Sequence, residues 1–569
     1  MYEDPSGNEV FGNNNVLRAL AKMKEEAMRL RSKFINSFLQ ADEYEAIGLC
    51  FQELYYYEPN AGKGFVAQHI DIIKKGASHI ELAEKFEQLR GNLLKTVQAV
   101  AENFGGGFDT FNDKLLNLVQ VFSHPKDFDR KIAIAIAAFY LIEALDSYVY
   151  NNLQYMSEFG EWPENGRGPM NQGVSKKKCL VYLKERRSFL SGAYKNNRTG
   201  FRTPLNAEDL GDIFSTIQIV SRNRLISNTG IPRIIPVRPN DDIKKNIAET
   251  GKFRIATIPF IGYDSFYFHE IGASTPCPPQ TLPQGRFYVE YSQEFEEENI
   301  RLMTHLLELA IRQGSNIIVL PEFIMSPSMR ESVVKYLSQM TDSWNSQLVL
   351  IFAGTTYEYS TPNKGNNVLY VMNARGSEIG KYYKFSPFHK DNKHDAPIEI
   401  SGDNSSVYFE NIELLSDPGK ECTIFDVEGI GRILPAICRD VVDGEYTSEL
   451  VKLFSPHLLL IPAWSSSVAS FDTYLAHYAN TIHTTSLLCN CCNAVKSIEA
   501  SESGTAIGRF CLPEKSETVM KAFPQSIYRS TECCNSCRDH GGCVVLIDVD
   551  FSKGMPQYHI MKAIHPKDT

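Results

Sequence analysis

After about residue 250, short apolar runs alternate with amphipathic segments, and this alternation limits the fold more than any other feature of the sequence. Residues 254–259 and 316–320 have the pattern of short buried strands. Residues 293–313 place apolar side chains at helical spacing, and Gly314 follows where a glycine commonly ends a helix. Further strands are expected at 348–353, 367–372 and 379–385, with a helix at 329–342. The alternation predicts an α/β domain over 250–569, with helices outside a buried sheet.

The N-terminal part of the chain has a different pattern. Residues 13–153 are rich in Ala, Leu, Lys and Glu at helical spacing, with breaks at Pro- and Gly-rich positions. No set of residues there suggests catalysis, so we expect an all-α accessory domain over 1–157. Its longest apolar run, 132–142, is about eleven residues and indicates a buried helix, because a bilayer needs about twenty.

Cysteine usage and the start of the sequence indicate where the protein works. The chain has 13 cysteines in 569 residues, and it opens with Met1-Tyr2-Glu3-Asp4, which lacks the features of a signal peptide. With 43% hydrophobic and 22% charged residues, the composition is typical of a soluble globular protein. We therefore expect a cytoplasmic protein with free thiols and no contact with a membrane.

A basic segment lies between the two predicted domains. Residues 176–238 contain thirteen Lys and Arg against four Asp and Glu, whereas the whole chain has a net charge of -10. Cations interleaved with aromatic rings suit a nucleic acid, but they also suit a solvated face or a dock for acidic parts of the same chain. We assign 158–249 as a basic connecting segment that could bind nucleic acid or a partner protein. The residues assigned to this contact are Lys176, Lys177, Lys178, Arg186 and Arg187.

Three residues capable of chemistry stand at the ends of predicted strands. The apolar run 433–437 ends in Cys438, which alone could be either an inert core thiol or a nucleophile. Glu322 follows a strand and a proline, where it could be a general base or simply the polar residue that ends the strand. Lys384 lies near the end of its strand, where the alternation of side chains points it inward and its neighbours Tyr383 and Phe385 outward. A lysine that faces inward must be paired or functional.

These three residues occur in an order that resembles the nitrilase superfamily, the carbon–nitrogen hydrolases with an αββα sandwich and a Glu-Lys-Cys centre. The resemblance covers about residues 250–560. The other matching positions include an asparagine, several glycines, a Tyr-x-Lys pattern, a Cys-x-Asp pattern and a Pro-Ala-Trp strand end: Asn299, Asn366 or Asn367, Gly376, Gly380, Tyr382, Pro418, Gly419, Asp440, Glu445, Trp464 and Asn493.

The resemblance implies a role for each residue of the centre. Cys438 would be the nucleophile, with its thiolate favoured by Lys384. Glu322 would be the general acid and base, and Lys384 would stabilise the oxyanion together with the backbone N–H of Arg439. Glu413 would be the second glutamate, which holds Lys384. The resemblance requires no metal and no other cofactor.

Three departures from the family pattern leave the substrate open. Arg439 stands where the family commonly has an aromatic residue, and His483 lies near a usual glutamate. Insertions at 260–291 and 388–411 are long enough to cover or reshape the pocket. The resemblance therefore implies a small non-peptide amide or nitrile without identifying it, and it does not separate hydrolysis from acyl transfer.

A second cysteine group precedes the last predicted strand. Several soft ligands within eleven residues could hold zinc, although two separated C-x-x-C halves are missing. The group consists of Cys533, Cys534, Cys537, His540 and Cys543. The sequence leaves its role open.

Two functions from different classes fit the whole chain. The first is an active carbon–nitrogen hydrolase, forming a dimer or larger homo-oligomer as the family does. The second is a catalytically silent scaffold with a nucleic-acid- or protein-binding N-terminal half. Because nitrilase-like domains also occur fused to anti-phage defence proteins, an effector role in such an assembly is a further prediction.

Overall fold

In the computed structural model, the described residues are 179–183, 217–221 and most of 232–565. The last range has gaps at 261, 263–264, 272–283, 341–346, 362–363, 392–406, 413–421, 443–444, 483, 496–505, 514–523, 528–541, 551–556 and 562. The predicted helical domain lies outside the described residues, and so do the five Lys and Arg residues assigned to nucleic-acid or partner binding.

The chain divides into two compact units. In the first unit, strands β1 (Cys179–Leu183) and β2 (Ile217–Ser221) pair in an antiparallel manner. The second unit contains all later elements and the candidate site.

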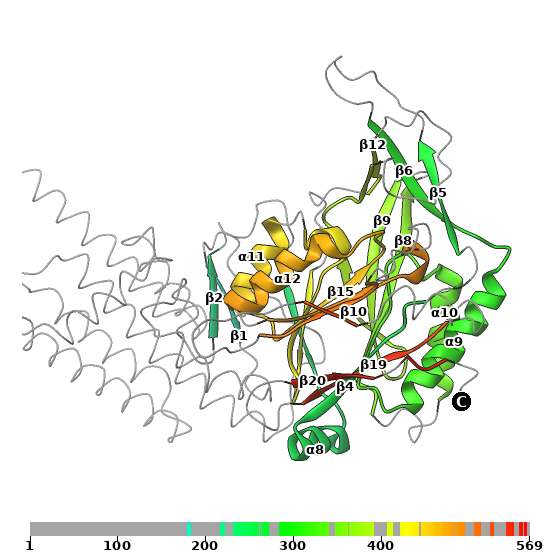
Figure 1. Cartoon of the computed structure of the whole chain (residues 1–569). Coiled ribbons are helices and arrows are strands. Elements are labelled where there is room, and N and C mark those ends of the chain that lie inside the picture. The colour runs from blue at the N-terminus through cyan, green and yellow to red at the C-terminus, as the bar shows by residue number, and fades with distance from the viewer. Residues whose placement is uncertain are drawn as a thin grey trace, which may run out of the picture. The chain divides into compact units, whose positions relative to one another are not determined.

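Two seven-stranded sheets form the centre of the second unit (Figure 1). The first sheet has the order β10 (Glu378–Tyr383), β9 (Lys364–Asn373), β8 (Leu350–Thr361), β7 (Ile317–Val319), β4 (Lys252–Thr257), β19 (Val545–Asp550) and β20 (Gln557–Ile560). The second has the order β18 (Gln525–Ser526), β17 (Arg509–Cys511), β16 (Thr485–Asn490), β15 (Leu458–Ala463), β14 (Gly431–Pro435), β13 (Thr423–Val427) and β3 (Arg233–Val237). Each sheet has parallel strands at its centre and antiparallel strands toward one or both edges.

The two sheets pack face to face through apolar side chains. The rings of Phe352 in the first sheet and Phe425 in the second lie 5.8 Å apart. A side chain at Gly380 would meet Phe425 and Thr423 at about 2.9 Å, so only glycine allows the sheets to approach this closely there. Interdigitated rings of this kind are how facing sheets exclude water from their common core.

Helices cover the outer faces of both sheets. Helices α9 (Glu296–Arg312) and α10 (Pro327–Gln339) bury apolar stripes on the side of the first sheet, and Gly314 takes the left-handed conformation expected after α9. Helices α11 (Glu445–Phe454) and α12 (Ala469–Ile482) lie on the second sheet, where Asp472 of α12 pairs with Arg509 of β17. The α/β fold class predicted for this part of the chain is confirmed, with four layers in the order helix, sheet, sheet, helix. No helix among the described residues is both long enough and apolar enough to cross a membrane.

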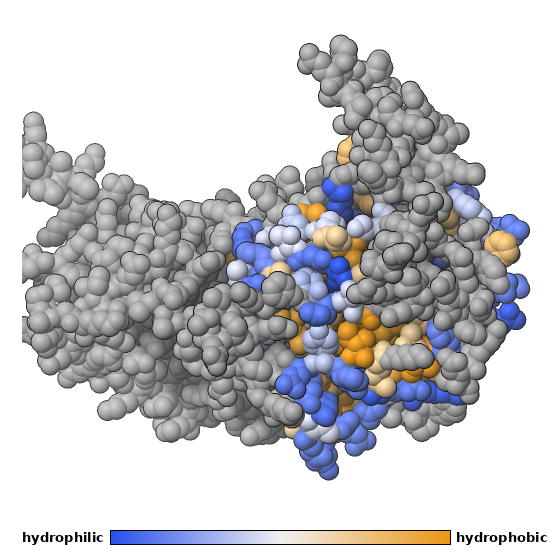
Figure 2. Space-filling view, viewed as in Figure 1, coloured by the Kyte–Doolittle hydropathy of each residue, from blue (hydrophilic) through white to orange (hydrophobic). Residues whose placement is uncertain are grey.

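The sandwich begins earlier than the predicted boundary at 250. Strand β3 pairs in parallel with β13, and α8 (Asp241–Thr250) buries Ile243 and Ile247. In the face shown in Figure 2, hydrophilic side chains gather on α8, at the lower edge of the view. Residues 233–250 therefore belong to the sandwich and not to a connecting segment.

The two predicted insertions combine into one small sheet. Its order is β11 (His389–Asp391), β12 (Val407–Glu410), β6 (Gln284–Tyr291) and β5 (Phe266–Ile271). Strands β5 and β6 come from the first insertion and β11 and β12 from the second, so segments more than 100 residues apart pair directly. The remaining short elements are the 3-10 turns η5 (Cys438–Asp440) and η6 (Cys492–Val495).

Candidate active site

The structure brings Glu322, Lys384 and Cys438 together at the ends of three strands. Glu322 follows β7, Lys384 follows β10, and Cys438 begins η5 just after β14. All three side chains are buried, with at most 2% of their surface exposed. The backbone N–H of Glu322 donates to the carbonyl of Ala463 at 3.3 Å, so this point joins the two sheets.

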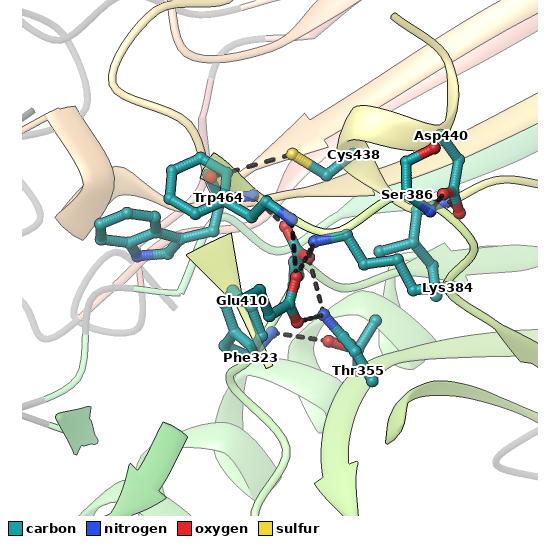
Figure 3. A network of polar contacts seen from close by, with 12 residues as sticks. Phe323, Thr355, Lys384, Ser386, Glu410, Cys438, Asp440 and Trp464 are labelled. Atoms are coloured by element: carbon teal, nitrogen blue, oxygen red, sulfur yellow. Dashed lines mark hydrogen bonds and ion pairs between the residues drawn. The ribbon is translucent and has the colours of Figure 1, made fainter. Parts of the chain in front are cut away.

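Lys384 is the centre of a double ion pair. Its Nζ donates to Oε1 of Glu322 at 2.7 Å and to Oε2 of Glu410 at 2.7 Å. Figure 3 shows Lys384 and Glu410 side by side. Glu410 ends β12, so the small sheet supplies this second carboxylate. The family resemblance assigns this contact to Glu413, but Glu410 makes it, and Glu413 lies outside the described residues.

Further donors satisfy the remaining oxygens of both carboxylates. The side-chain amide of Asn367 donates to Oε1 of Glu322 at 2.8 Å and to Oε1 of Glu410 at 3.0 Å. The sequence left Asn366 and Asn367 as alternatives, and the structure places Asn367 at the centre. The backbone N–H of Trp464 donates to Oε2 of Glu322 at 3.0 Å. Multiple donors of this kind allow two carboxylates to stay buried close together.

The buried charges of Glu322, Glu410 and Lys384 shift the pKa values within the site. Burial raises the pKa of Glu322, and the charge of Lys384 only partly offsets this effect. Burial alone would lower the pKa of Lys384, but the charges of Glu322 and Glu410 outweigh it and raise that pKa above its ordinary value. Lys384 is therefore a permanent cation, and Glu322 is a stronger base than an exposed glutamate.

Cys438 sits in an unusual backbone conformation. Its φ is 44°, in the left-handed region that side-chain-bearing residues rarely adopt, and its Sγ faces the carbonyl oxygen of Trp464 at 3.8 Å. Burial and the nearby charge of Glu322 raise the pKa of the thiol well above its ordinary value, although Lys384 acts in the opposite direction. The thiolate that Lys384 is expected to favour is thus not the resting form, because burial and the charge of Glu322 outweigh the effect of that cation.

Aromatic rings from the small sheet lie beside these groups. Phe268 of β5 packs 5.8 Å from Phe323, which follows Glu322, and 5.1 Å from Trp464. The ring of Phe388 lies 6.2 Å from Trp464 and 5.8 Å from Nζ of Lys384. The two insertions therefore build an apolar wall next to the site.

The other predicted positions have separate placements. Arg439 lies in η5, directly after Cys438, and is half-buried. Cys543 is buried, and the rest of its cysteine group lies outside the described residues. Within the described ranges, no cluster of three or more His, Cys, Asp or Glu could hold a metal ion.

Two residues of the site had weaker signals in the sequence. Glu410 ends a short apolar run within the second insertion, and a carboxylate at that position is the same signal that drew attention to Glu322. Asp440 stood out only as part of a Cys-x-Asp pattern, yet it is fully buried beside Cys438.

Residues 284–452 match the family model described as Carbon-nitrogen hydrolase. This match supports a nitrilase-type domain in the C-terminal part of the chain.

Solved structures of the nitrilase superfamily are also similar to the chain. An amidase from Nesterenkonia sp. AN1 is 13% identical, with 42% of this chain and 78% of that chain covered and a TM-score of 0.27. Nit3 of Saccharomyces cerevisiae, a member of branch 10 of the nitrilase superfamily, is 13% identical, with 48% and 89% covered and a TM-score of 0.28. No curated protein matches the chain.

Proposed function

We propose that this domain is a thiol-dependent hydrolase that cuts a small non-peptide amide or nitrile through a thioester on Cys438. The observation that carries the proposal is the double ion pair of Lys384 with Glu322 and Glu410 beside a buried thiol. A buried base, cation and thiol at three strand ends have the composition that nucleophilic acyl chemistry requires.

In the proposed reaction with an amide, Glu322 takes the proton of Cys438 as Sγ bonds to the carbonyl carbon. The raised pKa of Glu322 suits it to this transfer, because the thiol is protonated at rest. The carbon–nitrogen bond then breaks, and the nitrogen leaves with the proton that Glu322 received. Glu322 next activates a water molecule, which attacks the thioester and releases the acid and the free thiol.

Lys384 is suited to stabilise the oxyanion of the tetrahedral intermediate. An ammonium group has three N–H donors, and two of them go to Glu322 and Glu410. The third is left for a substrate oxygen, and the backbone N–H of Arg439 is the proposed second donor. Glu410, in the role that the family resemblance gives to Glu413, fixes the direction of Lys384.

Metabolite profiling tests this proposal even though the substrate is unidentified. Wild-type protein incubated with a metabolite extract should deplete one amide or nitrile and produce the matching acid, whereas Cys438→Ser should leave both unchanged. Cys511→Ser, which replaces a buried thiol in β17, is the matched control and should behave like the wild type. An extract that wild type and Cys438→Ser change equally would contradict the proposal and favour the silent scaffold.

The wider predictions belong to the same proposal. The resemblance implies a homo-oligomer, which light scattering of the purified chain would measure. Nucleic-acid binding by the basic segment and an effector role in an assembly such as anti-phage defence stay predictions. A shift of labelled RNA or DNA at low salt that is lost on neutralising Lys176, Lys177 and Lys178 would support the former.

A further inference from the structure

Asp440 is a third fully buried carboxylate near the candidate centre, and the ion pairs of Lys384 go to Glu322 and Glu410 instead. It lies two residues after Cys438, at the end of η5. A buried carboxylate is costly unless donors satisfy it, so its contacts indicate what it does.

Backbone N–H groups from two separate segments converge on this carboxylate. Oδ1 accepts from the N–H of Phe385 at 3.0 Å and from that of Ser386 at 2.6 Å. Oδ2 accepts from the N–H of Ile437 at 3.3 Å. Figure 3 shows Asp440 and Ser386 next to the chain of Lys384. One side chain thus joins the segment directly after Lys384 to the residue directly before Cys438.

Both joined segments need support at this point. The N–H of Lys384 bonds to the carbonyl of Asn367 at 2.9 Å, and the next two backbone donors go to Asp440. Cys438 holds a positive φ of 44°, which persists only where the surroundings determine it. The carboxylate of Asp440 bonds to the backbone next to both residues.

We propose that Asp440 is a positioning residue. Its ionised carboxylate holds the Lys384 ammonium and the Cys438 thiol in the relative positions that attack on the substrate requires. The proposal rests on the proposed function of Cys438. Asp440 does not touch the reacting atoms, and it acts through the backbone on either side of them.

The protonation state of Asp440 gives the proposal a pH dependence. Burial raises its pKa to about 7, against the lowering effects of Lys384 and of the three N–H donors. Among the described residues, Tyr382 of β10 and Cys422 beside β13 also interact electrostatically with Asp440, and Tyr446 of α11 hydrogen-bonds to Cys422. Only the ionised carboxylate can accept hydrogen bonds at both oxygens. The neutral acid carries an O–H donor on one oxygen, and that O–H would face a backbone N–H, which is also a donor. The reactivity of Cys438 should therefore rise as the pH passes through about 7.

The effect on stability has the opposite sign. Because the folded pKa lies above the ordinary value of 3.8, the fold binds the proton more tightly than the unfolded chain does. The stability that this proton contributes is present at low pH and is lost as the pH rises toward 7. The folded protein is therefore less stable with Asp440 ionised than with Asp440 protonated, although the ionised form is the one that positions the centre.

Asp440→Asn in the full chain tests the proposal, with the alkylation rate of Cys438 by iodoacetamide, read by mass spectrometry, as the measurement. At pH 8 the rate should fall by about 10- to 100-fold, since displaced groups lose much of their effective orientation. The rise near pH 7 should disappear. The melting temperature at pH 8 should change little, because removing a buried charge offsets the loss of an acceptor for one of the three backbone N–H groups.

Asp426→Asn is the matched control, since Asp426 is a buried carboxylate whose partner is Arg432 on the neighbouring strand, at 2.7 Å. It should lower the melting temperature and leave the pH profile of Cys438 alkylation unchanged. A wild-type rate and pH profile in Asp440→Asn would overturn the proposal, as would parallel losses of rate and melting temperature. If wild-type Cys438 itself shows no preferential alkylation, the proposed function fails instead, which separates the two failures.

Discussion

Lys384 illustrates, at the scale of one residue, how the candidate centre depends on a balance of buried charge. Its ammonium lies 2.7 Å from each of two carboxylates, and none of these side chains has measurable exposure. Taking an ion out of water costs several kcal/mol, and only close partners with good geometry repay that cost. Lys384 therefore holds the site together, and in the proposed reaction it also provides the cation for the substrate oxygen.

Lys384→Met is expected to destabilise the protein strongly, because it leaves Glu322 and Glu410 buried without their common cation. Removing one partner of a buried ion pair costs about 3–5 kcal/mol in the free energy of unfolding. Urea unfolding would measure this loss. Adding Glu322→Gln and Glu410→Gln to the same chain should recover most of the stability without restoring Cys438 reactivity. A Lys384→Met protein as stable as the wild type would contradict this balance of buried charge.

At the scale of elements, the small sheet does more than cover the site, because its strand β12 carries Glu410 into the centre. The sequence predicted the three strand ends and their order, since each is marked by an apolar run that stops at one charged or reactive residue. It did not predict Glu410, because the family's spacing pointed to Glu413 and the pairing of β12 with β6 joins distant segments.

Glu410→Gln and Glu413→Gln form a matched pair that tests the assignment. Glu410→Gln should slow the alkylation of Cys438 by about tenfold or more, because Lys384 loses one of the two charges that orient it. Glu413→Gln should leave the rate within about twofold of the wild type. Iodoacetamide labelling of both variants would measure the difference, and the reverse pattern would assign the role to Glu413.

At the scale of the whole molecule, the sandwich extends before the boundary that the sequence suggested. Pro236 and Pro239 favoured a connecting segment. However, among the strands that the structure describes, β3 is the last of its sheet and has β13 as its one neighbour, and proline is tolerated in such edge strands. The layered fold could therefore be predicted from the alternating pattern, whereas its first strand could not.

Two truncated chains test where the sandwich begins. A chain that starts at Pro232 keeps β3 and α8, whereas one that starts at Gly251 loses both. The shorter chain loses four buried isoleucines, Ile234, Ile235, Ile243 and Ile247. At about 1.5–3 kcal/mol for each fully buried side chain, this loss should lower its melting temperature or prevent folding. Equal melting temperatures for the two chains would place the boundary at 250 after all.

Site-resolved alkylation of the native chain would show whether Cys438 is a nucleophile whose proton is taken by Glu322. Iodoacetamide should modify Cys438 well ahead of Cys489, a thiol that is also buried but lies in β16 against the carbonyl of Val319. Glu322→Gln should slow the reaction at Cys438 by about 100-fold, the usual contribution of a general base, and should leave Cys489 unchanged. Equal rates at the two cysteines, or a rate at Cys438 that Glu322→Gln leaves unchanged, would exclude this role for Cys438 and Glu322.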